Sequence, residues 1–253
     1  MQEADARAAT QRKPLHLTAN LFAVPFGLAG LAQAWSTVTR LAGAPDWPGS
    51  VLWIIAAATW LITLAAYLTN VAAQRRWKTE LSDPTFGPFT ALIVIVPMLL
   101  GVRLAEQARG AGEVAFGCST VLVVLAGAWM TGDWIADDGN IRRWHPGYFL
   151  PTAAGGLLAG GGSAVLGFVT LSHVLFGLGI TSFVILASII QLRLFNAPSL
   201  PPPLLPTIAI DLAPPVVAGA RSHSPPPSPT PSTGWPPSTC AAARPSRTPW
   251  SAS

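Results

Sequence analysis

Long runs of apolar residues constrain this chain more than any other feature of its sequence. Between Leu17 and Leu194 they recur with lengths of about 20 residues, enough for a helix to cross a hydrocarbon layer roughly 30 Å thick. Only 10% of the 253 residues are charged, whereas an ordinary soluble domain has roughly 25%. Since a segment in lipid must satisfy its backbone hydrogen bonds internally, we expect an all-α, polytopic membrane protein.

Six of these runs are long enough to be full spans. We place them at Thr18–Leu41, Val51–Ala73, Phe89–Leu104, Val114–Ala136, Tyr148–Val169 and Leu171–Leu192. A partial seventh segment, residues 207–220, is too short to cross and contains Asp211 and the pair Pro214-Pro215. A carboxylate at mid-membrane costs about 2.5–3.5 kcal/mol, which makes Asp211 the candidate intramembrane carboxylate; a place at the membrane interface is the alternative.

The two ends of the chain differ in composition from its apolar part. Residues 1–16 are polar and show no clear signal-peptide pattern, so we expect a cytoplasmic N-terminal segment. Residues 17–220 form the expected transmembrane domain. Residues 221–253 are rich in Pro, Ser and Thr and contain no acidic residue, so they lack the side chains for a core and are expected to be disordered.

Lysine and arginine are unevenly distributed between alternate loops. Cytoplasmic loops of membrane proteins carry an excess of these residues. With the N-terminus inside, the inner set is Arg7, Arg12, Lys13, Arg75, Arg76, Lys78, Arg142, Arg143 and Arg193, and the outer set is Arg40, Arg103 and Arg109. Nine against three predicts a multi-pass protein of the plasma membrane with a cytoplasmic N-terminus.

Other classes of partner and cofactor find little support in the composition. The net charge of +4 comes from short clusters beside apolar runs, which favours membrane orientation over nucleic-acid binding. Cys118 and Cys240 are the two cysteines, and the four histidines are scattered, so neither a metal site nor a cofactor is indicated.

Proline occurs in alternate spans. Pro25, Pro97 and Pro151 lie in the first, third and fifth spans and Pro214-Pro215 in the partial seventh, whereas the second, fourth and sixth have none. A proline inside a helix frees the carbonyl four residues earlier, and that carbonyl needs a partner from protein or water. The carbonyls concerned belong to Leu21, Ile93, Gly147 and Ile210 or Asp211.

This alternation predicts helical hairpins, each with one proline-kinked helix in an inner ring around an aqueous path and one straighter helix in an outer ring. A general tolerance of membrane helices for proline is the alternative. In the fifth span, Gly156 and Gly160 add a spacing that favours close helix packing, and neighbouring glycines such as Gly155 would also leave room in a pore wall.

Four stretches carry a resemblance to a known family. They are Val24–Trp35 in the first span, Phe89–Ile93 in the third, His145–Thr152 leading into the fifth, and Pro206–Pro215. Together they resemble the tellurite-resistance and C4-dicarboxylate transporter family, which includes the plant slow-type anion channels. The resemblance covers roughly residues 17–219.

The resemblance implies ten helices in five hairpins, with the odd helices around a central pore, and passive movement of small inorganic or organic anions through the bilayer. It also implies a homotrimer. If a pore exists, the bent faces of the odd helices predict its lining residues, which are Phe22, Pro25, Phe26, Pro97, Pro151, Gly155 and Pro215. Packing against a neighbouring helix is the alternative for each phenylalanine.

Because the expected spans hold hardly any charge, selectivity would depend on pore width, backbone dipoles and the cost of dehydrating the anion. Arg103 follows the third span, where it would attract anions at the outer mouth or extend to lipid headgroups.

Two further hypotheses concern the end of the resemblance and a different class of protein. Apolar sequence gives way to Pro, Ser, Arg and Thr near Ala220, as a frame shift in a GC-rich gene would produce. The alternative function is therefore that of a truncated fragment of such a channel that does not transport anions.

A membrane prenyl transferase would use Asp137-Asp138 to hold magnesium and diphosphate. That chemistry needs several carboxylates, and no second acidic cluster follows, so we expect no enzyme.

Overall fold

Helices make up nearly all of the chain that the computed structural model describes, namely residues 17–74, 87–136, 144–196, 205 and 207–210. No β-strand occurs in these residues, which all belong to one unit, residues 1–222. The all-α prediction is therefore confirmed. The predictions for Asp137-Asp138, Asp211, Pro215 and the two termini lie outside the described residues.

All six expected spans occur, and the spans that contain Pro25, Pro97 and Pro151 differ from the other three in how they begin. The three proline-free spans are unbroken helices: α3 (Trp47–Gln74), α6 (Arg109–Ala136) and α8 (Val169–Asn196). The other three spans begin with 3₁₀ turns. In the first, η1 (Ala19–Phe22) precedes α2 (Ala23–Ala42), and in the third, η2 (Gly87–Ala91) precedes α5 (Leu92–Ala105). In the fifth, the 3₁₀ turn η4 (Pro146–Phe149) is followed by the π-helical turn η5 (Leu150–Ala154) and then by α7 (Gly155–Val165).

Five of the six spans are helices long and apolar enough to cross a membrane. The fifth span, which consists of three segments and is rich in glycine, is not among these five. Its expected end at Val169 was also four residues too late. The helix stops at Val165, and Gly167 turns the chain with a φ of 89°, a conformation that glycine adopts without the clash a Cβ would cause.

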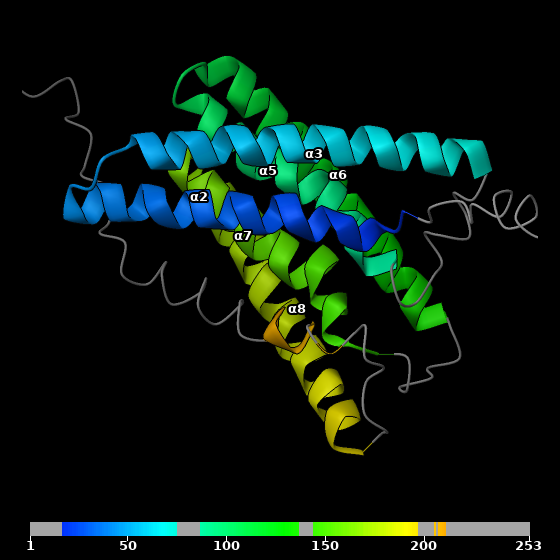
Figure 1. The fold of residues 1–253 in the computed structure, drawn as a ribbon. Helices are drawn as coiled ribbons and strands as arrows, with labels where there is room; N and C mark the ends of the chain where they lie inside the picture. The colour runs from blue at the N-terminus through cyan, green and yellow to red at the C-terminus, as the bar shows by residue number, and fades with distance from the viewer. Residues whose placement is uncertain (1–16, 75–86, 137–143, 197–204, 206, 211–253) are drawn as a thin grey trace, which may run out of the picture. The chain divides into compact units, whose positions relative to one another are not determined.

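Consecutive spans pair as antiparallel hairpins, α2 with α3, α5 with α6 and α7 with α8 (Figure 1). In the first hairpin the Trp53 Nε1 donates a hydrogen bond to the Ser36 Oγ at 3.3 Å. The third hairpin brings the backbones of Gly156 and Gly179 together. These pairs confirm the predicted series of helical hairpins.

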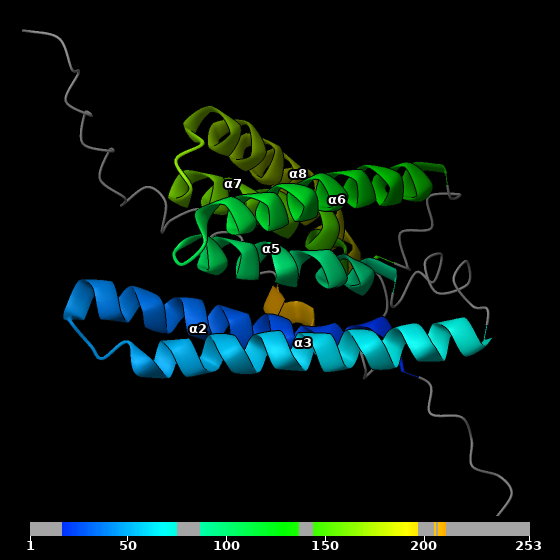
Figure 2. The same ribbon diagram turned by 90° about the horizontal axis from the view of Figure 1, so that it is seen from above.

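The proline-containing spans supply most of the contacts between hairpins. α2 packs against α5 and α5 against α7, and Figure 2 shows α5 between α2 and α6. α3, α6 and α8 pack on these spans and make no comparable contact with one another in the described part of the chain. The main core cluster contains residues of all six spans, and Phe22, Ile95 and Ala159 represent the first, third and fifth spans in it.

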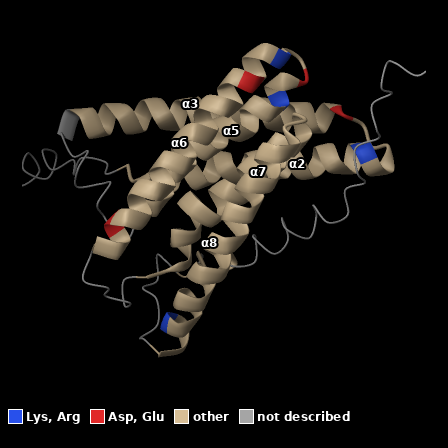
Figure 3. Cartoon of the chain, turned by 180° about the vertical axis from the view of Figure 1, so that it is seen from behind, with Lys and Arg blue, Asp and Glu red and all other residues tan. Residues whose placement is uncertain are grey.

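The outward faces of the regular helices are apolar. Ile54 and Leu61 of α3 are 69% and 58% exposed, and Val174 and Val184 of α8 are more than half exposed. Water would oppose the exposure of so many large apolar side chains, whereas lipid favours it. Charged residues lie near helix ends in the described part of the chain, which leaves the middle of each span uncharged (Figure 3). The protein is therefore a multi-pass membrane protein.

Candidate functional site

The carbonyl that Pro97 frees has a partner from the neighbouring outer helix. Pro97 lies inside α5 and has no N–H to offer the Ile93 carbonyl one turn earlier. The indole Nε1 of Trp60 in α3 donates to that Ile93 oxygen at 3.1 Å. An aromatic side chain thus replaces the missing backbone donor, so this carbonyl does not need water.

Pro151 in the fifth span is accommodated by a change of helix type. The N–H of Leu150 donates to the Gly147 carbonyl across a 3₁₀ turn. The N–H of Gly155 then donates to the Leu150 carbonyl, five residues back, as in a π-helix. The freed Gly147 carbonyl is therefore satisfied by protein, and the widened turn allows the chain to continue into α7.

Among the predicted pore-lining residues, the two phenylalanines lie where the proline-containing spans meet. Phe22 is fully buried, and its ring packs edge-to-face on Tyr67 of α3 with centroids 5.5 Å apart. Phe26 is partly buried against the same cluster, and Pro25 between them is buried. Both phenylalanines thus belong to the shared core, and Phe22 also packs against α3 within the first hairpin.

Pro151 and Gly155 instead lie against α6. A Cβ added at Gly155 would lie 2.4 Å from the Val123 Cγ1, and one added at Gly127 would lie 2.9 Å from the Pro151 oxygen. Gly155 therefore permits close helix packing on this side.

Pro97 lines a cavity of about 380 Å³ between α3, α5 and α6. Its other lining residues include Trp53 and Ile54 of α3 and Ala115 of α6. Pro97 thus shares this cavity with residues of α3 and α6.

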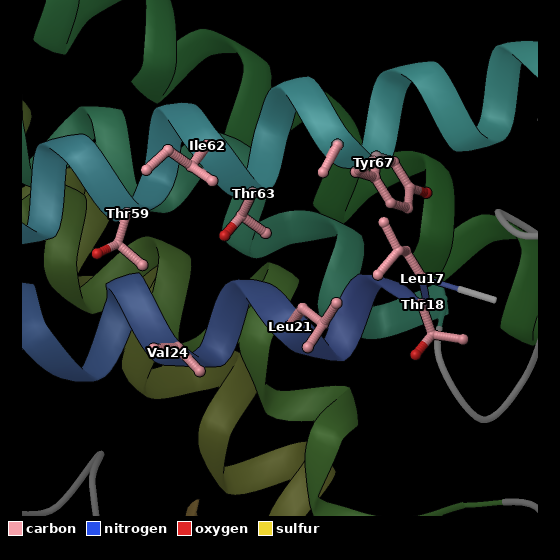
Figure 4. A pocket seen from close by; sticks show the side chains of 9 residues that line it. Leu17, Thr18, Leu21, Val24, Thr59, Ile62, Thr63 and Tyr67 are labelled. Carbon is pink, nitrogen blue, oxygen red and sulfur yellow. The ribbon is translucent and has the colours of Figure 1, made fainter. Parts of the chain in front are cut away.

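A second cavity, of about 200 Å³, lies within the first hairpin (Figure 4). Thr59, Ile62 and Thr63 of α3 face Leu21 and Val24 of the first span across it. It is mainly apolar, with threonine hydroxyls from both sides. Leu21 is the residue whose carbonyl Pro25 frees, so the cavity adjoins that irregular turn.

Carboxylates neutralise Arg103, the arginine expected to attract anions. It forms ion pairs with Glu106 and with Asp46, the latter at 3.9 Å, and its Nη2 donates to the Ser50 Oγ at 3.3 Å. Two acidic partners leave little net positive potential for a passing anion.

Two further residues became visible only in the structure. Trp60 has its role because Pro97, on a different helix, frees a carbonyl within its reach. Arg193 had been noted only as an inner positive charge, but it is 4% exposed, and its Nε and Nη1 have no hydrogen-bond partner in the described part of the chain. Its spacing of three and seven residues from Ile190 and Leu186 places it on the buried face of α8, which is a signal the sequence does contain.

The described residues contain no group of three His, Cys, Asp or Glu side chains that could hold a metal ion. The fold and these sites define a helical membrane protein whose interior is apolar, glycine-rich and nearly free of charge. The chain belongs to the voltage-dependent anion channel family, whose model matches residues 16–224. The family expected from the four sequence stretches is thus confirmed.

A curated relative supports this family. The chain is 28% identical over 204 residues to the tellurite resistance protein TehA homolog of Haemophilus influenzae. The match covers 80% of this chain and 62% of the relative, so the chain spans less than two thirds of that protein's length.

Proposed function

We propose that this protein provides a passive transmembrane path for small anions. The observation that carries the proposal is the match of the voltage-dependent anion channel family to residues 16–224, which include every described helix. The scarcity of charge in the described spans agrees with it, because a channel without fixed charges in its spans releases anions readily. No step of this function needs catalysis.

We place the path between the proline-containing spans. Phe22 and Phe26 are its foremost lining candidates, since they lie in the main core cluster, which includes residues of the first, third and fifth spans. Pro25, Pro97, Pro151, Gly155 and Pro215 remain proposed lining residues, and Asp211 remains a proposed intramembrane carboxylate that couples a proton to the solute.

An apolar, weakly charged path discriminates by dehydration. An anion must give up part of its water shell on entering, and the described spans offer few charged groups in return. We therefore expect weakly hydrated monovalent anions such as nitrate to pass faster than strongly hydrated divalent anions such as sulfate.

The location and assembly follow from the same proposal. We propose a plasma-membrane protein with a cytoplasmic N-terminus, on the basis of the nine-to-three distribution of Lys and Arg. A homotrimer is proposed from the family resemblance. Cross-linking of the purified protein in detergent and thiol labelling of a cysteine placed in residues 1–16 of intact cells would test assembly and orientation.

Anion flux into proteoliposomes tests the function. Liposomes containing the full chain should take up nitrate faster than protein-free liposomes, with slower uptake of sulfate and no uptake of potassium in the absence of an ionophore. Nitrate uptake equal to that of protein-free liposomes would contradict the proposal. Equal leakage of potassium would show a non-selective defect and would also contradict it.

A further inference from the structure

We propose that Arg193 forms an anion-binding site at the C-terminal end of α8, where the permeating anion is held at one mouth of the path. Its place on the path rests on the proposed function, whereas its capacity to bind an anion rests on the structure of α8 and its neighbours.

The guanidinium of Arg193 is buried without the partners that burial demands. The residue is 4% exposed, and within the described part of the chain neither its Nε nor its Nη1 has a hydrogen-bond partner. An arginine keeps its charge in proteins, so burial cannot be relieved by deprotonation. A buried charge without a partner is strongly destabilising, so we take a bound anion to be the partner that Arg193 lacks among the described residues.

Other arginines in the described part of the chain differ in this respect. Arg103 pairs with Glu106 and Asp46, and Arg109 donates to the Glu113 carboxylate at 2.7 Å and to the Leu166 carbonyl at 2.8 Å. Arg40 is exposed. Arg193 alone among these four combines burial with unpartnered donors.

The surroundings of Arg193 place it beside two proline-containing spans. It continues the buried face of α8 beyond Leu186 and Ile190, which pack with Tyr148 and Phe149 at the start of the fifth span. Ile210, at the start of the seventh segment, packs against the same cluster. Arg193 thus lies on α8 near the level at which these two spans begin.

The direction of α8 supports this placement. α8 runs antiparallel to the fifth span, since Gly179 lies against Gly156 and the rings of Phe183 and Phe149 are 5.3 Å apart. Moving along α8 from Phe183 to Arg193 therefore leads back past the first residues of the fifth span. An anion at Arg193 would be positioned where the fifth and seventh spans begin.

The ligand class follows from the guanidinium itself. Its planar array of N–H donors matches planar oxyanions such as nitrate or a carboxylate, which accept two hydrogen bonds side by side. The apolar neighbours Leu186 and Ile190 favour an anion that is small and weakly hydrated.

Thermal unfolding of the purified full chain in detergent tests binding without requiring transport. At constant ionic strength, replacing gluconate by nitrate should raise the unfolding temperature in a saturable way. Arg193→Gln should abolish the nitrate effect and Arg193→Lys should retain part of it, whereas Arg40→Gln, which removes an exposed arginine, should leave it unchanged. A nitrate effect of the same size in Arg193→Gln, or stabilisation by phosphatidylglycerol in place of nitrate, would overturn the proposal.

Nitrate flux tests the role on the path. Loss of one charge-assisted contact is expected to raise the half-saturating nitrate concentration about tenfold in Arg193→Gln and less in Arg193→Lys. Unchanged half-saturation in both variants would overturn the role on the path. If the wild-type chain showed no flux, the proposed function would fail while the unfolding assay would still decide whether Arg193 binds an anion.

Discussion

The α7–α8 and α2–α3 hairpins have the same topology but are closed by different residues. In α7–α8 the backbones meet at glycine: a Cβ added at Gly156 would lie 2.8 Å from the Gly179 Cα. In α2–α3 the helices meet through side chains, such as the edge-to-face contact of Phe22 with Tyr67. Glycine is present in both hairpins, so its presence alone does not determine how a hairpin closes.

The difference shows what a glycine does in a membrane helix. Gly27 and Gly30 of α2 have no atom within 4 Å of an added Cβ, whereas Gly156 and Gly160 of α7 face the backbone of α8. Lipid is as apolar as the side chains it replaces, so helices associate through packing, and small residues increase packing only where a second backbone faces them. The third hairpin should therefore be sensitive to an added methyl group and the first should not.

The largest expected effect is at the α7–α8 contact. Gly156→Ala would force its new methyl group into the backbone of Gly179, and overpacking of this kind costs about 1–3 kcal/mol. Thermal unfolding in detergent should show a clear loss of stability. The matched control is Gly161→Ala on the same helix, where an added Cβ has open space and should cost nothing. Equal losses in the two variants would show that glycine does not close this hairpin.

A smaller effect is expected where α3 compensates for Pro97. Trp60→Phe removes the indole donor to the Ile93 carbonyl and should cost about 1–2 kcal/mol, because a part-buried acceptor loses its partner. In a Pro97→Ala background the new alanine would supply the backbone N–H that proline lacks, so the cost of Trp60→Phe should fall.

A double-mutant cycle of unfolding free energies measures this coupling directly. Additive effects of Trp60→Phe and Pro97→Ala would mean that the indole does not substitute for the missing N–H.

A still smaller effect is expected within the first hairpin. Trp53→Phe retains the aromatic packing but loses the hydrogen bond from Nε1 to the Ser36 Oγ, at a cost of about 1 kcal/mol. Ser36→Ala should weaken the hairpin by a similar amount, and the double variant should be no worse than either single change. Unfolding of the three variants under one set of conditions would show whether this pair contributes at all.

The smallest effect should come from Arg103. Its ion pairs are partly exposed, and such pairs contribute about 0–1 kcal/mol. Because Glu106 and Asp46 already neutralise its charge, Arg103→Gln should change nitrate flux by less than about twofold. A larger loss, measured beside Glu106→Gln, would mean that Arg103 attracts anions despite its carboxylates.

Local properties of the sequence predicted much of this fold. The length of the apolar runs gave the six spans, and the spans with Pro25, Pro97 and Pro151 are the three that begin with a 3₁₀ turn. Each of these signals acts within one span. The end of the fifth span was misplaced because apolar residues continue through the turn at Gly167.

The partners of the proline sites could not be predicted, because they depend on packing between spans. Trp60 lies 33 residues from the carbonyl it contacts, and Gly155 faces Val123 of α6 only because the hairpins dock in one particular register. The sequence likewise identified Arg193 as a charge, and its spacing from Ile190 and Leu186 puts the three on one face of a helix, but that this face is buried is shown only by the structure. Predicted lining residues were chosen by span, and span alone does not determine which way a side chain faces.

Thiol accessibility in the first hairpin tests most directly whether the proline-containing spans line the path. After both native cysteines are replaced by serine, Phe26→Cys in α2 is compared with Leu61→Cys in α3, which is 58% exposed on the outward face. We predict that a small, membrane-impermeant thiol reagent blocks nitrate flux through the Phe26→Cys protein and leaves the Leu61→Cys protein unaffected. Flux that is blocked at Leu61→Cys and insensitive at Phe26→Cys would contradict the account.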